Sequence, residues 1–290
     1  MNQEALSKRI KTTSDLHGIV NTMKMLSSVS LIQYEKARTS LNQYAQTIKL
    51  AFQGVFSQED FSYPNQTKNK EGKVLYLLIG SDNGLVGRFN RDLVQKFEEN
   101  RHKNTSVITI GKRITSSVLA KDFQPIAVYS NSNSLKEISS LADALLSKIN
   151  SVLSKENFEK VILYYNHKKN NSFELKTFQL FPFSDEIKSN IKQNSWPGRM
   201  IPLISNENEG LFSALVQEYL VVFLVQALTE SLVCEHYIRM LHMQQAEKNI
   251  EKKLAELDLL YQQARQNKIT DELIDIVSGA QAMSNPLTKK

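Results

Sequence analysis

Few residues in this 290-residue chain have the type and spacing needed for chemistry. The first candidate is the stretch 80–87, Gly-Ser-Asp-Asn-Gly-Leu-Val-Gly, which follows an apolar run as a nucleotide-binding loop follows a strand. A P-loop needs Lys-Ser/Thr after its last glycine, and a dinucleotide-binding loop needs the spacing G-x-G-x-x-G. The stretch has neither feature. We therefore expect a tight strand-to-helix connection in which glycine supplies positive φ angles, and no bound cofactor.

Histidine and cysteine are the next candidates. The chain has one cysteine, Cys234, and five histidines, at positions 17, 102, 167, 236 and 242. Cys234 and His236 are two residues apart on an expected helix, so they point about 200° apart and are poorly placed to share a metal. A single cysteine excludes an intrachain disulfide and favours a reducing compartment, and its apolar neighbours predict a buried, inert thiol. No catalytic constellation emerges, so we expect neither an enzyme nor a metal site.

Net charge and hydropathy narrow the possible classes of protein further. The net charge of +6 is a mild basic excess that selects no partner by itself. The most apolar run, Tyr219–Val225, has seven residues, whereas a membrane span needs roughly 20. We therefore expect that run to be a buried helix segment. The polar N-terminus, Met1–Arg9, gives no sign of a signal peptide.

The two ends of the chain have the pattern of long helices. Residues 1–57 and 208–284 contain no proline, and their apolar residues recur at steps of three and four. In the N-terminal segment these residues are Leu16, Ile19, Met23, Leu26, Ala37, Leu41, Tyr44, Ile48, Phe52 and Val55; in the C-terminal segment they are Met243, Ala246, Ile250, Leu254, Leu257, Tyr261 and Ala264. The second series is close to the a/d repeat of a coiled coil. At about 1.5 Å per residue, Leu6–Phe56 and Leu211–Ser278 are roughly 75 and 100 Å long, too long for a compact domain. We therefore expect the two terminal segments to form an antiparallel two-helix coiled coil.

The middle of the chain, residues 73–205, alternates strand and helix patterns. Strands are expected at 74–79, 107–110, 126–129, 161–165 and 173–181, and helices at 91–100, 112–120 and 135–153. This alternation predicts an α/β, Rossmann-like domain with a mostly parallel sheet. Polar residues 57–72 form the connection before it, the Trp196-Pro197-Gly198 break lies near its end, and residues 285–290 form a tail.

The last part of the C-terminal segment resembles a known signature. Residues 269–282 match I-T-x-E-x-x-D-x-x-x-G-A-x-A at all seven specified positions: Ile269, Thr270, Glu272, Asp275, Gly279, Ala280 and Ala282. This is the C-terminal signature of the gamma subunit of F-type ATP synthases. Thr22-Met23-Lys24-Met25-Leu26 resembles the family's A-M-K-M-V stretch, and residues 81–87 resemble its S-D-x-G-L-C-G loop. The resemblance covers essentially the whole chain.

The resemblance implies a central rotor shaft without catalytic groups or a cofactor. Its partners would be the ring of alpha and beta subunits, the epsilon subunit and the membrane c-ring, with no nucleic acid. The location implied is the cytoplasmic face of the plasma membrane, as a peripheral protein. Met23, Lys24, Arg265 and Gln266 would contact the beta subunits.

Some residues resemble a sub-lineage more closely. Thr22-Met23-Lys24, Gln33-Tyr34-Glu35 and 246–251 (Ala-Glu-Lys-Asn-Ile-Glu) are similar to the alternate, sodium-type bacterial F-type ATPases. Departures from the family are Gly18 in place of lysine, Val86 in place of cysteine and Phe89 in place of leucine. The coupling ion and the direction of operation, synthesis or hydrolysis, stay open at this point.

Two other classes of function remain as alternatives. One is a nucleotide-binding enzyme built on the α/β domain, which would bind ATP or NAD tightly as an isolated chain. The other is a free-standing coiled-coil scaffold, which would dimerise alone and ignore ATPase subunits.

Overall fold

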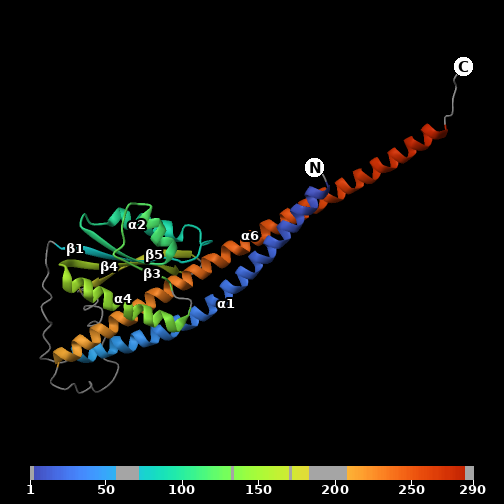
Figure 1. Cartoon of the computed structure of the whole chain (residues 1–290). Coiled ribbons are helices and arrows are strands. Elements are labelled where there is room, and N and C mark those ends of the chain that lie inside the picture. Colours follow the sequence, from blue (N-terminus) through green and yellow to red (C-terminus); the bar gives the residue numbers. More distant parts are fainter. Residues whose placement is uncertain (1–2, 57–71, 132–133, 170–171, 183–207, 285–290) are drawn as a thin grey trace. The chain divides into compact units, whose positions relative to one another are not determined.

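The computed structural model describes residues 3–56, 72–131, 134–169, 172–182 and 208–284. Residues 57–71 of the connection expected at 57–72, the Trp196-Pro197-Gly198 break and the tail at 285–290 lie outside these residues. Two long helices, α1 (Gln3–Phe56) and α6 (Asn208–Ser284), flank the sheet in the sequence (Figure 1). The chain divides into two compact units. We call Met1–Leu26 with Met240–Lys290 the helical-pair unit, and Ser27–Arg239 the sheet unit.

The sheet unit contains five strands in the order β3-β2-β1-β4-β5. They are β1 (Lys73–Ile79), β2 (Thr105–Ile110), β3 (Ala127–Tyr129), β4 (Phe158–Lys169) and β5 (Ser172–Phe181). The first four strands are parallel, and β5 is antiparallel to β4. The predicted mostly parallel sheet is therefore confirmed. Every residue of β1 after Lys73 is buried, as expected for a parallel strand covered on both faces.

Helices cover both faces of this sheet. Helices α2 (Phe89–Asn100) and α3 (Lys112–Leu119) pack on one face, where Leu93 and Phe97 meet Tyr76 and Tyr164. Helix α4 (Leu135–Lys155) and the first half of α6 cover the other face (Figure 1). On that face Phe223 of α6 stacks on Phe178 of β5, with ring centroids 3.7 Å apart. Because α6 closes the sheet, the C-terminal segment is part of the α/β core.

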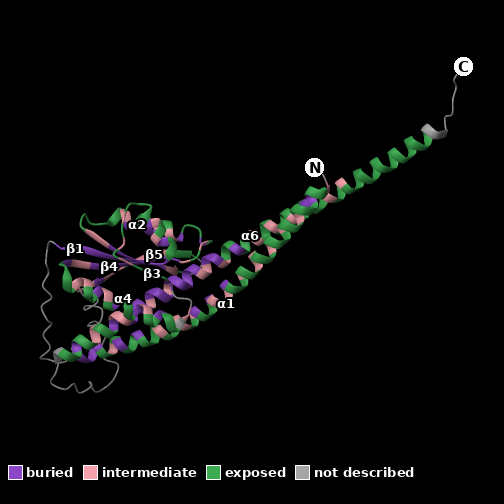
Figure 2. Cartoon of the chain, viewed as in Figure 1, coloured by how far each residue is buried: buried purple, intermediate pink, exposed green. Residues whose placement is uncertain are grey.

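In each unit α1 and α6 lie antiparallel, as the sequence predicted. In the sheet unit Phe52 packs edge-on against Phe212 at 6.1 Å, and Tyr34 stacks on His236 at 5.4 Å. In the helical-pair unit Gln3 Nε2 donates a hydrogen bond to the Tyr261 hydroxyl at 3.2 Å. Buried side chains are dense in the sheet unit and sparse in the helical-pair unit (Figure 2).

The apolar rows that the sequence predicted on α1 and α6 differ in burial. The expected α6 row from Met243 to Ala264 is buried or half-buried throughout. In α1, by contrast, Leu16, Ile19, Met23 and Leu26 are exposed. The α1 positions that are buried or half-buried in the helical-pair unit are Gln3, Leu6, Ile10, Thr13, His17, Val20, Asn21 and Lys24. The helix was predicted correctly, but its covered side in this unit mixes polar with apolar residues.

One 18-residue stretch of α6, with a mean hydropathy of 1.8, is long and apolar enough to cross a membrane. The core helix of a globular protein has the same length and composition. The run Tyr219–Val225 packs within the fold, because Tyr219 and Val222 share a core cluster with Phe52 of α1 and Leu224 is fully buried. This run is a buried helix segment, as the sequence predicted.

Candidate functional site

The glycine-containing loop after β1 uses its polar groups inside the fold. Ser81 N–H donates to the Asn90 side-chain carbonyl at 3.0 Å. The Asp82 carboxylate accepts from Lys112 N–H at 2.8 Å, at the start of α3, and from Asn131 N–H at 3.0 Å. A helix N-terminus favours an anion, and here Asp82 supplies it. These three backbone N–H groups are therefore already bonded within the fold and are not available to a phosphate.

Two glycines of this loop are required by its geometry. A Cβ added at Gly80 would lie 2.4 Å from the Ile114 Cβ, which is closer than real Cβ contacts allow. Gly87 has a φ of 58°, a conformation that favours glycine. The expected tight connection is confirmed, with Leu85 also at positive φ.

Helix α6 occupies the place where an α/β sheet of this order usually binds a nucleotide. That place lies outside the carboxyl ends of the strands where the strand order reverses, here between β1 and β4. Ser231 donates from its hydroxyl to the carbonyl of Ile79, the last residue of β1, at 3.4 Å. Beside it, Cys234 and Ile238 of α6 form a buried cluster with Val86 and Phe89. This crevice is filled by side chains of the chain itself, which argues against the nucleotide-enzyme alternative.

A buried ion pair joins α6 to the same loop. The Arg239 guanidinium contacts Glu235 Oε1 at 2.6 Å and donates from Nε to the Gly84 carbonyl at 3.4 Å. Burial raises the pKa of Glu235, while the charge of Arg239 acts against that rise. Sequence reasoning missed this pair; its only signal was the i,i+4 spacing of opposite charges on α6.

The expectations for Cys234 and His236 are met. Cys234 is fully buried, and burial raises the pKa of its thiol to about 12. His236 points elsewhere, onto the ring of Tyr34, and burial lowers its pKa to about 4. Neither side chain has the exposure or the protonation behaviour of a catalytic group.

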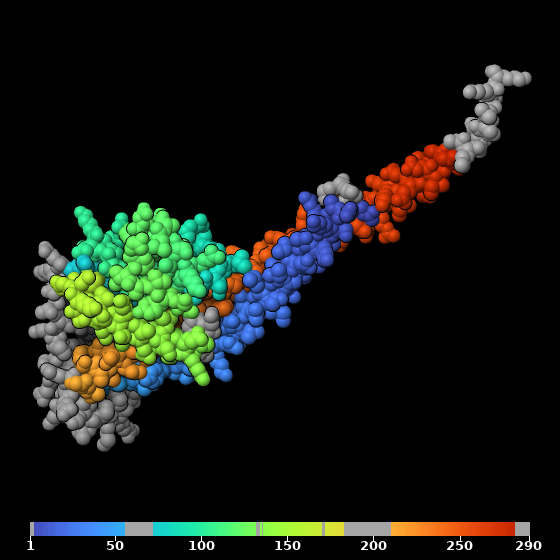
Figure 3. All heavy atoms as spheres, viewed as in Figure 1, coloured from blue at the N-terminus to red at the C-terminus, as the bar shows by residue number. Residues whose placement is uncertain are grey.

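The C-terminal end of α6 has a different surface. Gln3 pairs with Tyr261, so α6 continues past the first turn of α1 for more than twenty residues (Figure 3). Arg265 and Gln266 are exposed there, and so are the signature residues Ile269, Thr270, Glu272, Asp275, Gly279 and Ala280. The apolar members of this end, Leu273, Ile274, Ile276 and Val277, are also more than half exposed. Exposed apolar side chains at this density mark a protein-binding surface.

Met23 and Lys24 lie on different sides of α1. Met23 is exposed, with 37% of its surface accessible. Lys24 is half-buried, and its ammonium is 2.6 Å from both carboxylate oxygens of Glu247 on α6. Of the four residues expected to contact a partner, Met23, Arg265 and Gln266 are therefore exposed. Lys24 is bonded to Glu247 within the helical pair.

Where α1 begins against α6, a groove of about 440 Å³ is lined by Leu6, Leu260, Ala264 and Lys268, among others. Arg265 and Gln266 are the residues next to it in the sequence. This end of the helical pair thus combines a concave surface, hydrogen-bonding groups and exposed apolar residues. Such a surface can bind another protein, and it holds no nucleophile–base pair.

Comparison with known proteins gives one consistent result. A protein-family model described as ATP synthase matches residues 2–283. The ATP synthase gamma chain of Christiangramia forsetii is 26% identical over 296 aligned residues, which cover 98% of this chain and 99% of the relative. The gamma chain of Wolbachia sp. subsp. Drosophila simulans is 29% identical over 302 residues, with coverage of 96% and 98%.

The fold is also found in solved structures. A chain of the Euglena gracilis mitochondrial ATP synthase (OSCP/F1/c-ring, rotational state 3) superimposes with a TM-score of 0.67 at 19% identity, covering 99% of this chain and 98% of that one. At this identity the likeness concerns the fold. The family model spans nearly the whole sequence, and the relatives that align over nearly their full length are ATP synthase gamma chains. This chain therefore belongs to the F-type ATP synthase family as a gamma chain.

Proposed function

We propose that this chain is the central rotor shaft of an F-type ATP synthase, coupling ATP synthesis or hydrolysis to ion flow through a membrane c-ring. The observation that carries the proposal is the family match over residues 2–283. The gamma chain is a non-catalytic subunit, and catalysis takes place in the beta subunits. The filled crevice beside β1 agrees with that role, because it leaves the α/β domain no nucleotide site there.

A rotor acts mechanically. It presents a different face to each catalytic subunit in turn, so the shaft angle is linked to the affinity of each site for nucleotide. The shaft in this proposal is the helical pair together with the distal part of α6. The exposed apolar residues from Ile269 to Val277 support it, since a cluster of exposed apolar side chains is typical of a surface that binds another protein.

We assign the contact with the beta subunits to Met23, Lys24, Arg265 and Gln266. Arg265 offers a fork of charged hydrogen-bond donors, and Gln266 offers both a donor and an acceptor. Lys24 would reach a beta subunit only by leaving Glu247. Gly279 also supports a close partner at the distal end. Glycine costs a helix interior about 1 kcal/mol relative to alanine, yet a Cβ at this position would meet nothing within 4 Å in the chain itself. A partner that packs closely against α6 would explain the glycine.

The remaining assignments follow from the family and from the sequence motifs. The alpha and beta ring surrounds the helical pair and the distal part of α6, and the domain at 73–205 binds the epsilon subunit and the c-ring. The complex lies on the cytoplasmic face of the plasma membrane. The motifs Thr22-Met23-Lys24 and Gln33-Tyr34-Glu35 support placement in the alternate, sodium-type sub-lineage.

Reconstitution tests the proposal. ATP turnover is measured for this chain alone, for its alpha and beta subunits, and for all three together. We expect no turnover by the chain alone and a marked rise when it joins alpha and beta. The same assay on the whole enzyme with its c-ring, with and without Na⁺, tests the sub-lineage, for which we expect stimulation by Na⁺.

A double variant tests the contact residues in the same assay. Arg265→Ala with Gln266→Ala should lower turnover while the complex still assembles, because a contact made at one shaft angle affects the cycle more than assembly. The matched control is Lys252→Ala with Lys253→Ala, two exposed residues of the same helix, which should leave turnover unchanged. Full turnover by the assembled Arg265/Gln266 variant would remove these residues from the mechanism. Turnover by the chain alone at the rate of the complex would overturn the rotor proposal itself.

A further inference from the structure

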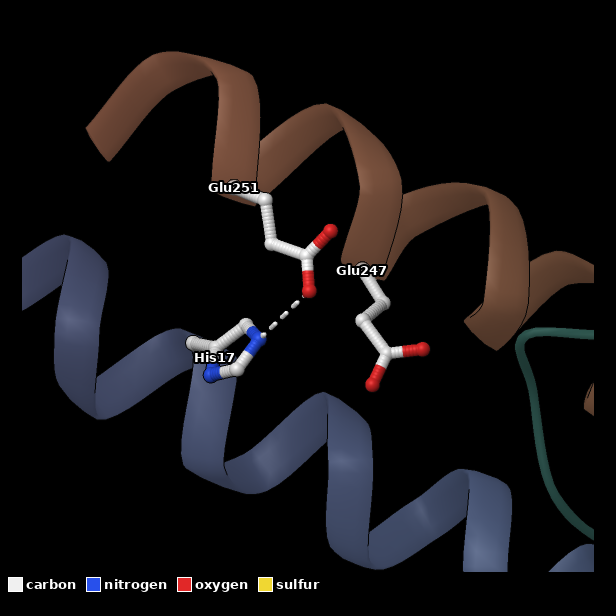
Figure 4. Close-up of side chains that lie close together, drawn as sticks. All are labelled: His17, Glu247 and Glu251. Atoms are coloured by element: carbon white, nitrogen blue, oxygen red, sulfur yellow. Dashed lines mark ion pairs between the residues drawn. The ribbon is translucent and has the colours of Figure 1, made fainter. Parts of the chain in front are cut away.

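The contact between α1 and α6 in the helical-pair unit contains a group of side chains that the rotor function does not explain. His17 of α1 faces Glu247 and Glu251 of α6 (Figure 4). The two glutamates are four residues apart, so they project from adjacent turns of one helix face. No metal site was expected here from the sequence, and the side chain of Glu247 is only 16% exposed.

The distances suit a metal ion. One ligand atom from each of His17, Glu247 and Glu251 lies within 4.8 Å of the other two. His17 Nε2 is 3.6 Å from Glu251 Oε1. In a tetrahedral zinc site with bonds of about 2.0–2.2 Å, two ligand atoms are about 3.3–3.6 Å apart. The His17–Glu251 edge is therefore already close to the geometry of a bound ion.

The histidine nitrogen in this group lacks a hydrogen bond. Among the described residues His17 Nε2 is buried from solvent and has no hydrogen-bond partner, although the side chain as a whole is 33% exposed. A buried polar atom without a partner costs free energy. A cation between His17 and the carboxylates would satisfy this lone pair in the neutral imidazole.

The charges also favour a cation. Two carboxylates at i,i+4 repel each other, and the ammonium of Lys24 pairs with one of them, Glu247. The ammonium of Lys24 is 2.6 Å from both oxygens of Glu247. A carboxylate has two oxygens with about four acceptor positions, so one oxygen can bind a metal while the other keeps Lys24. Lys24 would then orient the ligand, as outer-shell partners do at other metal sites.

We propose that His17, Glu247 and Glu251 bind a divalent transition-metal ion, with Zn²⁺ preferred, in a site that joins α1 to α6. One imidazole and two carboxylates match the ligand set of zinc, and three protein ligands leave a fourth position for water. Oxygen-preferring Mg²⁺ and Ca²⁺ should bind far more weakly, because a neutral imidazole suits them poorly. The bound ion would tie the two helices together at the level of His17.

Isothermal titration calorimetry of the full chain with Zn²⁺ tests the proposal. We expect one equivalent of Zn²⁺ to bind, with a rise in the thermal midpoint of the helical pair, since a ligand that binds only the folded state stabilises it. His17→Gln and Glu251→Gln should each weaken binding at least tenfold, as removing a ligand costs no less than removing an outer-shell partner.

Two matched variants serve as controls. His242→Gln removes an exposed histidine of α6, and Glu256→Gln removes an exposed carboxylate one helical turn beyond the site; both should bind Zn²⁺ as the parent chain does. The circular dichroism of each variant without metal confirms that it is folded. No binding by the parent chain, or equal binding by the parent and His17→Gln, would overturn the proposal, and so would loss of binding in His242→Gln.

Discussion

His236 illustrates at the scale of one residue how the core of the sheet unit accepts a titratable group. Its ring stacks on Tyr34, and among the described residues its Nδ1 atom is buried without a hydrogen-bond partner. Glu235, beside it in the sequence, is buried as well but has Arg239 at 2.6 Å. Burial lowers the pKa of His236, and the positive charge of Arg239 lowers it further. The core therefore keeps His236 neutral.

This arrangement predicts a loss of stability in acid. The pKa of His236 falls from 6.5 to about 4 in the folded chain, so its contribution is present above pH 6.5 and is lost as pH falls toward 4. The loss amounts to about 2 kcal/mol at pH 5. His236→Phe keeps the ring stacking and removes the titration. Urea unfolding at pH 7 and pH 5 should show an acid loss smaller by about that amount in the variant.

The control for this prediction is His242→Phe, an exposed histidine of α6 given the same substitution. It should leave the pH dependence of the parent chain unchanged. Identical acid losses in His236→Phe and the parent chain would show that His236 does not titrate as the structure implies.

At the scale of the elements, α1 and α6 pack differently in the two units. In the sheet unit their contact is apolar and aromatic, with Phe52 between Phe212 and Tyr219. In the helical-pair unit the α1 side of the contact contains His17 and Lys24, and α6 supplies most of the apolar surface. Polar residues in a helical pair fix its register at a cost in stability. The few buried apolar residues of this unit should therefore matter individually.

Leu257 provides the test, because only 4% of its surface is exposed. Leu257→Ala removes buried methyl groups and should cost about 2–3 kcal/mol of unfolding free energy. Leu259→Ala, two residues along the same helix and 62% exposed, should change the stability by no more than about 0.5 kcal/mol. The measurement is urea unfolding followed by circular dichroism. Similar costs for the two leucines would mean that the contact face of α6 has been assigned wrongly.

For the whole molecule, burial is distributed unevenly. The strands β1 and β4 lie inside a sheet covered on both faces, whereas α6 after Arg265 has exposed side chains at every described position. A helix of this length without packing has little stability of its own in water. In the isolated gamma chain, the backbone hydrogen bonds of β1 should therefore be among the most stable. Those of α6 after Arg265 should be among the least stable.

Hydrogen exchange followed by mass spectrometry measures this difference. Amides of α6 after Arg265 should exchange at least 100-fold faster than those of β1, because local opening of unpacked elements costs little. If the rotor proposal holds, adding the alpha and beta subunits should protect the α6 amides and leave β1 unchanged. Equal protection of the two elements in the isolated chain would contradict the burial pattern.

Local sequence patterns determined the elements and their order. The absence of proline and the regular three- and four-residue steps predicted both long helices, and the buried run at 74–79 predicted the central strand. The signature at 269–282 indicated the gamma-chain family, which the family match over residues 2–283 confirms. These features could be predicted because helix periodicity and motif spacing depend on residues that are near one another in the chain.

The tertiary structure decided which faces meet. The exposed row of Leu16, Ile19, Met23 and Leu26 looked like a packing face, yet the row with His17 and Lys24 is the one that meets α6. Likewise, only the fold brings Arg239 to Gly84, and His17 to Glu247 and Glu251. The members of these pairs lie more than 150 residues apart in the chain, so their contact leaves no periodic pattern in the sequence. Whether they meet depends on where the fold places each residue in space. The filling of the crevice beside β1 by α6 could be seen only once the chain was folded.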